Sequence, residues 1–463
     1  MRRLTPLLVL LAGCPTTEPD PEPTPAPRAP YDAEHCAYFL TGEVDLEGTD
    51  ADGDGIANTW DHCPNNPENW LDSDRDGIGN NHDDDLDGDG IPNADDPDRD
   101  GDGASNDDEA AASTDPDDPS MVPGLPVYDG DPGVFDPTPG WYLGDLHVHT
   151  EYSHDSTVPV ADWADAAVGG GLDFVWITDH RTFQAPFDPA FEDDRVLLVP
   201  AIEWGGGGHA GMGGVRTNNE ANYDDPADVL RAWTLARLQG GVQSLNHYGD
   251  DINYWDTLLA AEPALKAMLD VVEVWNTWWP VSQGMNEDSI DFWEGLLAEG
   301  YRIGAVGGSD VHYLGLAIGF PTTVVWADSL SIPGINAGLR TGRSFVTQSF
   351  PYRDGEIFSY EALPMLDFRG DADGDGTFEA MLGDTVAAGP VDFQLSVRFA
   401  HGPVVLFRDG VEIARFDDHA PGADIAPIVT DDAPPGSWYR VEMRETAEPD
   451  SAMLLLSSPI YVD

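Results

Sequence analysis

Basic residues are scarce in this 463-residue sequence, which has 21 Lys and Arg against 86 Asp and Glu and a formal net charge of −65. Lys266 is its single lysine. So large an excess of negative charge argues against binding to a phosphate backbone, and no nucleic-acid partner is expected. It is typical instead of solvated acidic segments or of bound hard cations.

Long apolar runs are missing as well, since no stretch reaches the roughly 18 apolar residues that a transmembrane helix needs. The chain begins with Arg2-Arg3, a short apolar run from Leu4 to Leu11, and then Ala12-Gly13-Cys14, which is typical of an export signal. This ending resembles the bacterial lipoprotein signal, which implies that Cys14 is lipidated and becomes the mature N-terminus. Cleavage of an ordinary secretory signal nearby is the alternative. A lipoprotein would be exported and held at the membrane by its lipid alone, in the periplasm or at the cell surface.

Cysteine is equally rare, with Cys14, Cys36 and Cys63 as its three occurrences. Outside the cytoplasm the environment is oxidising, so Cys36 and Cys63 could form a disulfide, with two free buried thiols as the alternative. No cysteine lies near the histidine motifs described below, which argues against a structural zinc there.

What the sequence does have is a repeated acidic pattern between residues 50 and 109. Four units begin at Asp50, Asp72, Asp85 and Asp98, with oxygen-bearing side chains at positions 1, 3, 5, 9 and 12 and glycine at position 6. This is the ligand register of the EF-hand calcium loop, although no amphipathic helices are expected to flank each loop. The predicted calcium ligands are Asp50, Asp52, Asp54, Asn58, Asp61, Asp72, Asp74, Asp76, Asn80, Asp83, Asp85, Asp87, Asp89, Asn93, Asp96, Asp98, Asp100, Asp102, Asn106 and Glu109.

The repeats resemble thrombospondin type 3 repeats, including the ending Asp61-His62-Cys63-Pro64, and this implies a calcium-ordered, semi-rigid stalk. An acidic disordered linker would explain the charge but not the four-fold register. A fifth calcium-like loop, Asp371 to Glu379, lacks an acidic residue at position 12, where Leu382 stands.

A second pattern is a set of histidines at the ends of apolar runs. His147 and His149 lie two residues apart after an apolar start, so on a strand they would face the same side. Two further apolar runs end in Thr178-Asp179-His180 and in Gly308-Ser309-Asp310-Val311-His312. Because functional residues of α/β barrels gather at the carboxyl ends of parallel strands, these side chains are expected to converge on metal.

The order of motifs resembles the polymerase-and-histidinol-phosphatase (PHP) superfamily, and within it the carbaryl-esterase-like CehA/McbA branch. The match runs from about Trp141 to Phe350, and it adds Pro200-Ala-Ile-Glu203, Gly208-His209 and Asn246-His247 to the motifs above. It implies a distorted α/β barrel of about seven βα units that binds two or three divalent transition metals. Imidazole and carboxylate ligands fit zinc, manganese or iron.

The resemblance also implies roles for single residues. His147, His149, Glu203 and Asp310 would hold one metal, and Glu203 would bridge to a second that His209 and His247 also bind. Asp155, His180 and His312 would form a third site. The expected catalytic residues are Asp310, Glu203, His312 and Arg181, the last as a partner for an anionic oxygen.

Several of these assignments have alternatives. His154 competes with Asp155 as a ligand, and Asp155 is preferred because the family's ligand falls six residues after the second histidine. His209 could be a surface residue of its glycine-rich loop, and Arg181 could form an ordinary salt bridge. Asn276 could contact substrate. His247 is followed by Tyr248 where the family usually has proline, which could alter the pocket.

The sequence therefore predicts a multidomain protein, in which helical stretches such as Asp225 to Leu238 and Asp288 to Leu297 alternate with apolar strands. Residues 1–14 form the signal, 15–45 a Pro-rich linker, 46–118 the calcium repeats, 119–140 a connector, 141–350 the α/β barrel with a parallel sheet, and 351–463 a small antiparallel β-sandwich. The predicted function is metal-dependent hydrolysis of a phosphoester or of a carboxylic or carbamate ester in a small molecule. The alternative is a catalytically inactive, calcium-dependent surface binding or adhesion lipoprotein.

Overall fold

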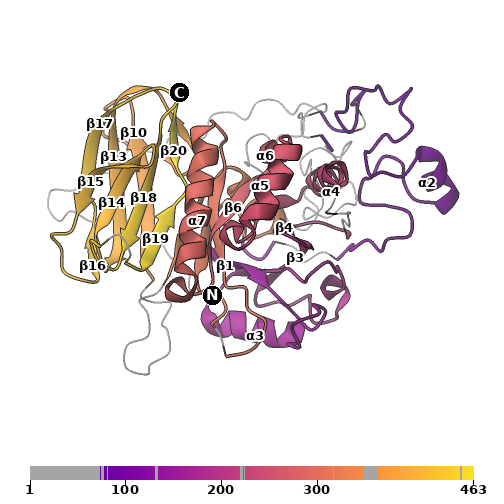
Figure 1. The fold of residues 1–463 in the computed structure, drawn as a ribbon, viewed down its shortest axis with the longest axis horizontal. Helices are drawn as coiled ribbons and strands as arrows, with labels where there is room; N and C mark the ends of the chain where they lie inside the picture. Colours follow the sequence, from indigo (N-terminus) through magenta and orange to yellow (C-terminus); the bar gives the residue numbers. More distant parts are fainter. Residues whose placement is uncertain are drawn as a thin grey trace, which may run out of the picture.

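The structure, a computed structural model, describes residues 73–74, 78–80, 82–130, 134–218, 223, 225–315, 317–348, 363–448 and 451–463. The predictions for the export signal, Cys14, the Cys36–Cys63 pair and the first calcium unit lie outside these residues, as do those for Asp72 and Asp76. The later acidic repeats lie at one end of the molecule and the C-terminal strands at the other, with an α/β domain between them (Figure 1).

The α/β domain is built on a curled sheet with the strand order β8-β1-β2-β3-β4-β5-β6-β7. Its apolar strands are buried along most of their length, as expected when helices and loops cover a sheet. The bounds are β1 Gly140–Val148, β2 Phe174–Ile177, β3 Leu197–Gly205, β4 His209–Gly213, β5 Val242–Leu245, β6 Val271–Asn276, β7 Gly304–Gly308 and β8 Thr322–Ala327.

The sheet curls far enough to bring β7 against β1. The backbone N–H of Asp310 donates to the carbonyl of His147 at 2.9 Å, and that of His149 donates to the carbonyl of Val311 at 3.1 Å. The strand ends that carry the histidine motifs are therefore neighbours in space, although more than 150 residues separate them in sequence.

The prediction of a parallel sheet is wrong for two strands. β4 runs antiparallel to both β3 and β5, and β8 runs antiparallel to β1. The link between β3 and β4 is the short loop Gly206 to Gly208, which permits only a hairpin, because a parallel crossover needs a dozen or more residues.

Helices flank this sheet, and two of them were predicted. The expected helix from Asp225 to Leu238 is confirmed as α4, Pro226–Leu238, whose N-cap Asp225 accepts a hydrogen bond from the backbone N–H of Ala227. The expected helix from Asp288 to Leu297 lies inside the longer α7. No helix in the described ranges combines the length and the apolar character needed to cross a bilayer. The helices are α3 Val160–Gly170, α5 Ile252–Ala261, α6 Leu265–Met268, α7 Trp279–Ala298 and α8 Ile332–Arg340, with short 3-10 turns at Ala185–Phe187 and Tyr248–Asp250.

The C-terminal region forms two β layers, which Figure 1 shows beside α7. They pack through side chains such as Phe393 and Tyr439, whose rings stack 4.2 Å apart. One layer is continuous with the barrel sheet, because β19 pairs with β9, so the expected sandwich is not a separate pair of sheets. The strands are β9 Ser344–Thr347, β10 Met365–Asp371, β11 Ala380–Met381, β12 Thr385–Val386, β13 Gly389–Ala400, β14 Val404–Arg408, β15 Val411–Phe416, β16 Ala423–Ile425, β17 Ile428–Ala433, β18 Trp438–Arg444, β19 Met453–Ser457 and β20 Ile460–Val462.

The third and fourth acidic units fold into similar loops. Gly90 N–H donates to Asp85 at 3.0 Å, and Gly103 N–H donates to Asp98 at 3.1 Å. The loop predicted at Asp371 has the same contact from Gly376, at 2.9 Å. The position-nine asparagines share a backbone contact, because the side-chain oxygens of Asn80, Asn93 and Asn106 each accept from the backbone N–H of the second residue of the unit. Through this hydrogen bond each asparagine stabilises the conformation of its loop.

The fourth unit ends in a helix and packs on the α/β domain. α2, Asn106–Ala112, begins inside the loop, and the residue it buries is Glu109. Arg216 donates to Ser120 at 3.0 Å and lies 3.7 Å from the carboxylate of Asp118. The predicted connector also packs against the α/β domain, since Tyr128 is buried and its N–H donates to the carbonyl of Arg216.

Candidate metal centre

The histidine and carboxylate motifs converge at the carboxyl ends of the strands. His147 lies one residue before the end of β1, His149 directly follows that strand, His180 follows β2 and His247 follows β5, while Asp310 and His312 follow β7. Glu203 lies in β3, His209 begins β4, and Asp155 lies in the loop after β1. The structure thus brings together all nine residues that the sequence predicts as transition-metal ligands, in overlapping groups whose ligand atoms lie within 4.8 Å of one another.

Glu203 lies at the centre of the cluster and is 1% exposed. Its Oε1 is 2.9 Å from His147 Nε2 and 3.2 Å from His247 Nε2. Its Oε2 is 3.0 Å from His180 Nδ1 and 3.4 Å from His149 Nε2. One carboxylate therefore faces two different sets of imidazoles, as a residue that bridges two ions must.

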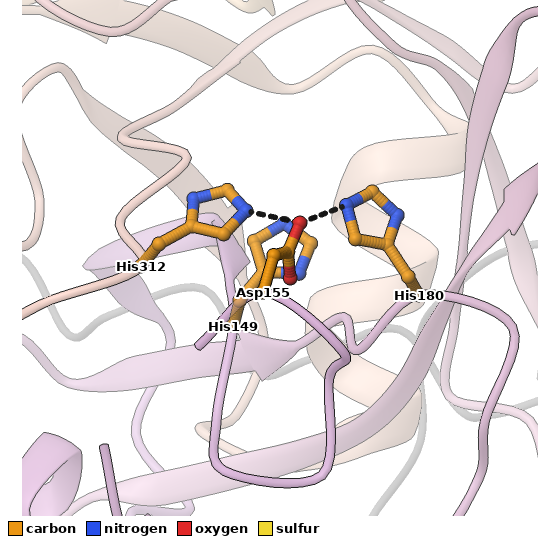
Figure 2. Close-up of side chains that lie close together, drawn as sticks. All are labelled: His149, Asp155, His180 and His312. Atoms are coloured by element: carbon orange, nitrogen blue, oxygen red, sulfur yellow. Dashed lines mark ion pairs between the residues drawn. The ribbon is translucent and has the colours of Figure 1, made fainter. Parts of the chain in front are cut away.

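A second group surrounds Asp155, which lies between two histidines in Figure 2. Its Oδ2 is 3.1 Å from His180 Nε2 and 3.2 Å from His312 Nε2. The ring of His149 stacks on both, and its centroid is 4.1 Å from that of His312. The competing His154 is 66% exposed and lies 3.9 Å from Asp155, outside this group.

Asp310 links the two groups. Its Oδ1 is 3.4 Å from His147 Nε2, 3.2 Å from His149 Nε2 and 3.6 Å from His312 Nδ1. Its backbone φ of +53° is unusual for a residue that is not glycine, and so is the +26° of His247. Strained backbone at two of the converging residues is typical of a functional site.

Burial and charge oppose each other in the cluster. Burial favours neutral forms, but the carboxylates around His147 outweigh it and raise the pKa of that imidazole well above its usual range. Burial also opposes ionisation of Glu203 and Asp310, but the surrounding imidazoles, His147 foremost, together outweigh it and hold both carboxyl pKa values well below their usual range. Burial dominates at His180 and lowers its pKa to about 4. The carboxylates are therefore ionised ligands at neutral pH.

Buried polar atoms without hydrogen bonds test whether metals fit this site. Nε2 of His147, Nε2 of His149 and Oε2 of Glu203 make no well-aligned hydrogen bond among the described residues, although charged groups lie close to them. Such orphaned atoms are costly unless a ligand satisfies them. Imidazole nitrogens and carboxylate oxygens that aim at shared points are the donor set of zinc, manganese or iron, so the residues fit divalent metals.

The cluster is open on one side. His147, His149 and Glu203 are almost fully buried, whereas the side chains of Asp310 and His312 are 25% and 23% exposed. Asp155 and His209 are likewise about a third exposed. A substrate would therefore approach from the side of the exposed ligands.

Arg181 and Asn276, two further predicted residues, differ in their burial. Arg181 is exposed, and its guanidinium donates to the hydroxyl of Tyr223 at 3.1 Å. Asn276 is 3% exposed, and its amide donates to Glu273 and to Asp310, which makes it a support for a candidate ligand and not the predicted substrate contact. Tyr248 packs its ring on Phe292, with centroids 4.0 Å apart.

Two carboxylates that lie behind the histidines were not predicted from the sequence. Glu273 lies 3.0 Å from His147 Nδ1, and Asp251 lies 3.4 Å from His247 Nδ1. A charged residue inside the apolar run Val271 to Trp275 was the available signal for Glu273, because a buried charge needs a partner. Asp251 could have been noticed from its spacing of four residues after His247.

No family model matches the sequence, and a search of curated proteins finds no match. Two similar solved structures are a two-domain protein from Bacteroides vulgatus containing a predicted PHP-like metal-dependent phosphoesterase and a predicted metal-dependent phosphoesterase from Bifidobacterium adolescentis. The first is 17% identical with a TM-score of 0.39, covering 70% of this chain and 96% of that one. The second is 18% identical with a TM-score of 0.27, covering 38% of this chain and 90% of that one. Because both TM-scores are low, we base the function on the geometry of the site.

Proposed function

We propose that this chain is a metal-dependent hydrolase of the PHP type, related to the CehA/McbA branch, that cleaves a small phosphoester or a carboxylic or carbamate ester. The observation that carries the proposal is the set of buried, orphaned ligand atoms around Glu203. Two or three divalent ions would satisfy them. An inactive binding protein would have no need to keep nine converging ligand residues in this arrangement.

Divalent metals held here would lower the pKa of a coordinated water towards about 7 and polarise an oxygen of the substrate. The residues of the chain supply the positioning of metals and substrate. Glu203 fixes the spacing between the two halves of the site. Asp310 and His312, the exposed pair of ligands, line the side from which the substrate would approach, and the proton that the attacking water loses is returned to the leaving oxygen. Water thus adds its oxygen to phosphorus or carbonyl carbon, and the ester oxygen leaves as an alcohol.

Apolar side chains beside the open side support a substrate with an apolar or aromatic group. Tyr313 and Leu314, directly after His312, are 61% and 51% exposed. Trp278, which follows the end of the neighbouring strand β6, is 42% exposed. Large exposed apolar residues next to a buried polar cluster are typical of a ligand-binding rim.

The fourth acidic loop supports the proposal of bound calcium. Asp100 and Glu109 are fully buried, yet Oδ2 of Asp100 and both carboxylate oxygens of Glu109 have no hydrogen-bond partner among the described residues. Oxygen ligands of this kind suit calcium. The calcium-bound units would form a stalk, and the pattern before Cys14 supports export as a lipid-anchored protein, periplasmic or at the cell surface.

The test is the metal content of the full-length protein purified without chelator. We expect about two or three equivalents of zinc, manganese or iron, a sharp fall in Asp310→Ala, and hydrolysis of a phosphoester or carboxylic ester that the same variant loses. A folded wild-type protein that binds none of these metals and cannot be loaded with them would overturn the proposal.

A further inference from the structure

Glu273 is the one charged residue in the apolar strand β6, Val271–Asn276, and its side chain is 2% exposed. A carboxylate buried this deeply is costly unless its oxygens are satisfied. Both oxygens point toward the candidate metal centre, but the sequence motifs assign Glu273 no role there.

The two oxygens have different partners. Oε1 lies 3.0 Å from Nδ1 of His147. Oε2 accepts from the backbone N–H of His247 at 2.9 Å and from the side-chain amide of Asn276 at 3.1 Å. The same amide nitrogen of Asn276 is 3.3 Å from Oδ2 of Asp310. One carboxylate therefore contacts, directly or through Asn276, residues assigned to both metals that Glu203 would bridge.

The contact with His147 selects a tautomer. Nε2 of His147 faces Glu203 and Asp310, at 2.9 and 3.4 Å, so this nitrogen must carry a lone pair when it binds a metal. A neutral imidazole has one N–H, and a carboxylate beside Nδ1 keeps the proton there. Carboxylates on the far nitrogen of a ligating histidine commonly set its orientation and basicity.

We propose that Glu273 is a positioning residue that holds His147 in the Nδ1–H form and fixes the spacing of the two metal sites through His247 and Asn276. The inference rests on the proposed metal-dependent function. Glu273 lies behind the ligands, away from any substrate.

Glutamine cannot replace this carboxylate. The backbone N–H of His247 always donates, so it requires the glutamine oxygen on its side. The glutamine NH2 would then face Nδ1 of His147 and donate to it. His147 would have to move its proton to Nε2, the nitrogen that faces the metal site.

Glu273 and His147 are packed closely against Gly308. A Cβ added at Gly308, on the adjacent strand β7, would lie 2.7 Å from Oε1 of Glu273 and 2.3 Å from Cβ of His147. No side chain can be placed between the two residues, and the pair is held directly against the backbone of β7.

The experiment compares full-length wild type, Glu273→Gln and Glu273→Asp in zinc titrations and in long-range proton–nitrogen correlation spectra of the histidines. Zinc-loaded wild type should show His147 with a proton on Nδ1 and zinc on Nε2. Glu273→Gln should show the proton on Nε2 and bind zinc about 10- to 100-fold more weakly. Glu273→Asp keeps two accepting oxygens and should retain the wild-type tautomer.

Asp145→Asn is the matched control. Asp145 is also fully buried beside His147, but it accepts only from backbone N–H groups and the Ser309 hydroxyl. Its variant should lose stability and keep the tautomer of His147. Wild type that binds zinc through Nδ1 of His147 would overturn the inference even if Glu273→Gln does not fold, and so would unchanged zinc affinity in that variant. Wild type that binds no metal would instead overturn the proposed function.

Discussion

Asp251 and His247 face each other at the back of the candidate metal centre, with Oδ2 of Asp251 3.4 Å from Nδ1 of His247. Nε2 of the same ring lies 3.2 Å from Glu203. Both Asp251 Oδ2 and His247 Nδ1 are buried and have no well-aligned hydrogen bond among the described residues. The imidazole therefore lies between two carboxylates, one on each nitrogen.

This arrangement predicts the effect of Asp251→Asn. Loss of the carboxylate should weaken binding of one metal about 10- to 100-fold, because the imidazole loses its orienting partner. The check is a zinc titration against a competing chelator. Asp250→Asn, at the exposed neighbouring position, is the control and should bind like wild type. Equal affinities of all three proteins would contradict the prediction.

The group around Asp155 predicts a second contrast between adjacent residues. Asp155→Asn should lose about one equivalent of metal, since Oδ2 of Asp155 is the atom that faces both His180 and His312. His154→Ala should keep the full complement, because its ring is 66% exposed. Metal analysis of both variants by mass spectrometry decides between them. Loss of metal in His154→Ala alone would reverse the assignment.

The buried carboxylates of the fourth acidic loop predict calcium-dependent stability. At about 100 times its dissociation constant, calcium should stabilise the folded protein by about 2.7 kcal/mol, seen as a higher melting temperature by calorimetry. Glu109→Gln should lose most of this gain. Asp107→Asn, exposed on the same helix, should retain it. A melting curve insensitive to calcium in wild type would rule out a structural calcium here.

The same loop predicts a pH dependence when calcium is chelated. Burial raises the pKa of Asp100 to about 9 and that of Glu109 to about 8. Because these values exceed those of the unfolded chain, the folded state keeps protons that the unfolded state has lost. Stability should therefore fall as pH rises from about 4 towards 8 or 9. Melts in chelator across this range test it, and Glu109→Gln should show a smaller fall.

The apolar rim predicts an effect on substrate binding. Tyr313→Ala should raise KM for an aryl ester several-fold and change kcat little, because removal of a rim contact weakens ground state and transition state alike. Val411→Ala is a suitable control, being an exposed apolar residue on β15 of the C-terminal layers. Steady-state kinetics with an aryl ester and a methyl ester test this prediction. In Tyr313→Ala the KM for the aryl ester alone should change.

Motif order and apolar periodicity were enough to predict much of the site. The runs that end in His180 and His312 form β2 and β7, and their parallel neighbours bring the histidines together. Short-range geometry was harder to predict. The first half of α7 contains Gly284 and Asn286, which are poor helix formers, and packing overrides their low helix propensity. Asn286, for example, accepts from the backbone N–H of Asn276.

The partner of a supporting carboxylate was harder to predict for a different reason. Glu273 and His147 are 126 positions apart, and no local pattern connects them. Only the curl of the sheet brings β6 behind β1. The backbone contacts of Asn93 and Asn106 were also not predicted, because a spacing of ligand oxygens does not show which of them also accept from the backbone.

The shared sheet has a consequence for how this protein can be divided. Residues 344–347 pair with β19 on one side and β8 on the other, and the hydroxyl of Ser458 accepts from the backbone N–H of Ala305 in β7. A chain cut after residue 350 would expose the unpaired edge of β9 and invite association with other chains. The histidine-bearing domain and the C-terminal layers therefore share one sheet, and a shortened chain avoids such an edge if it keeps both.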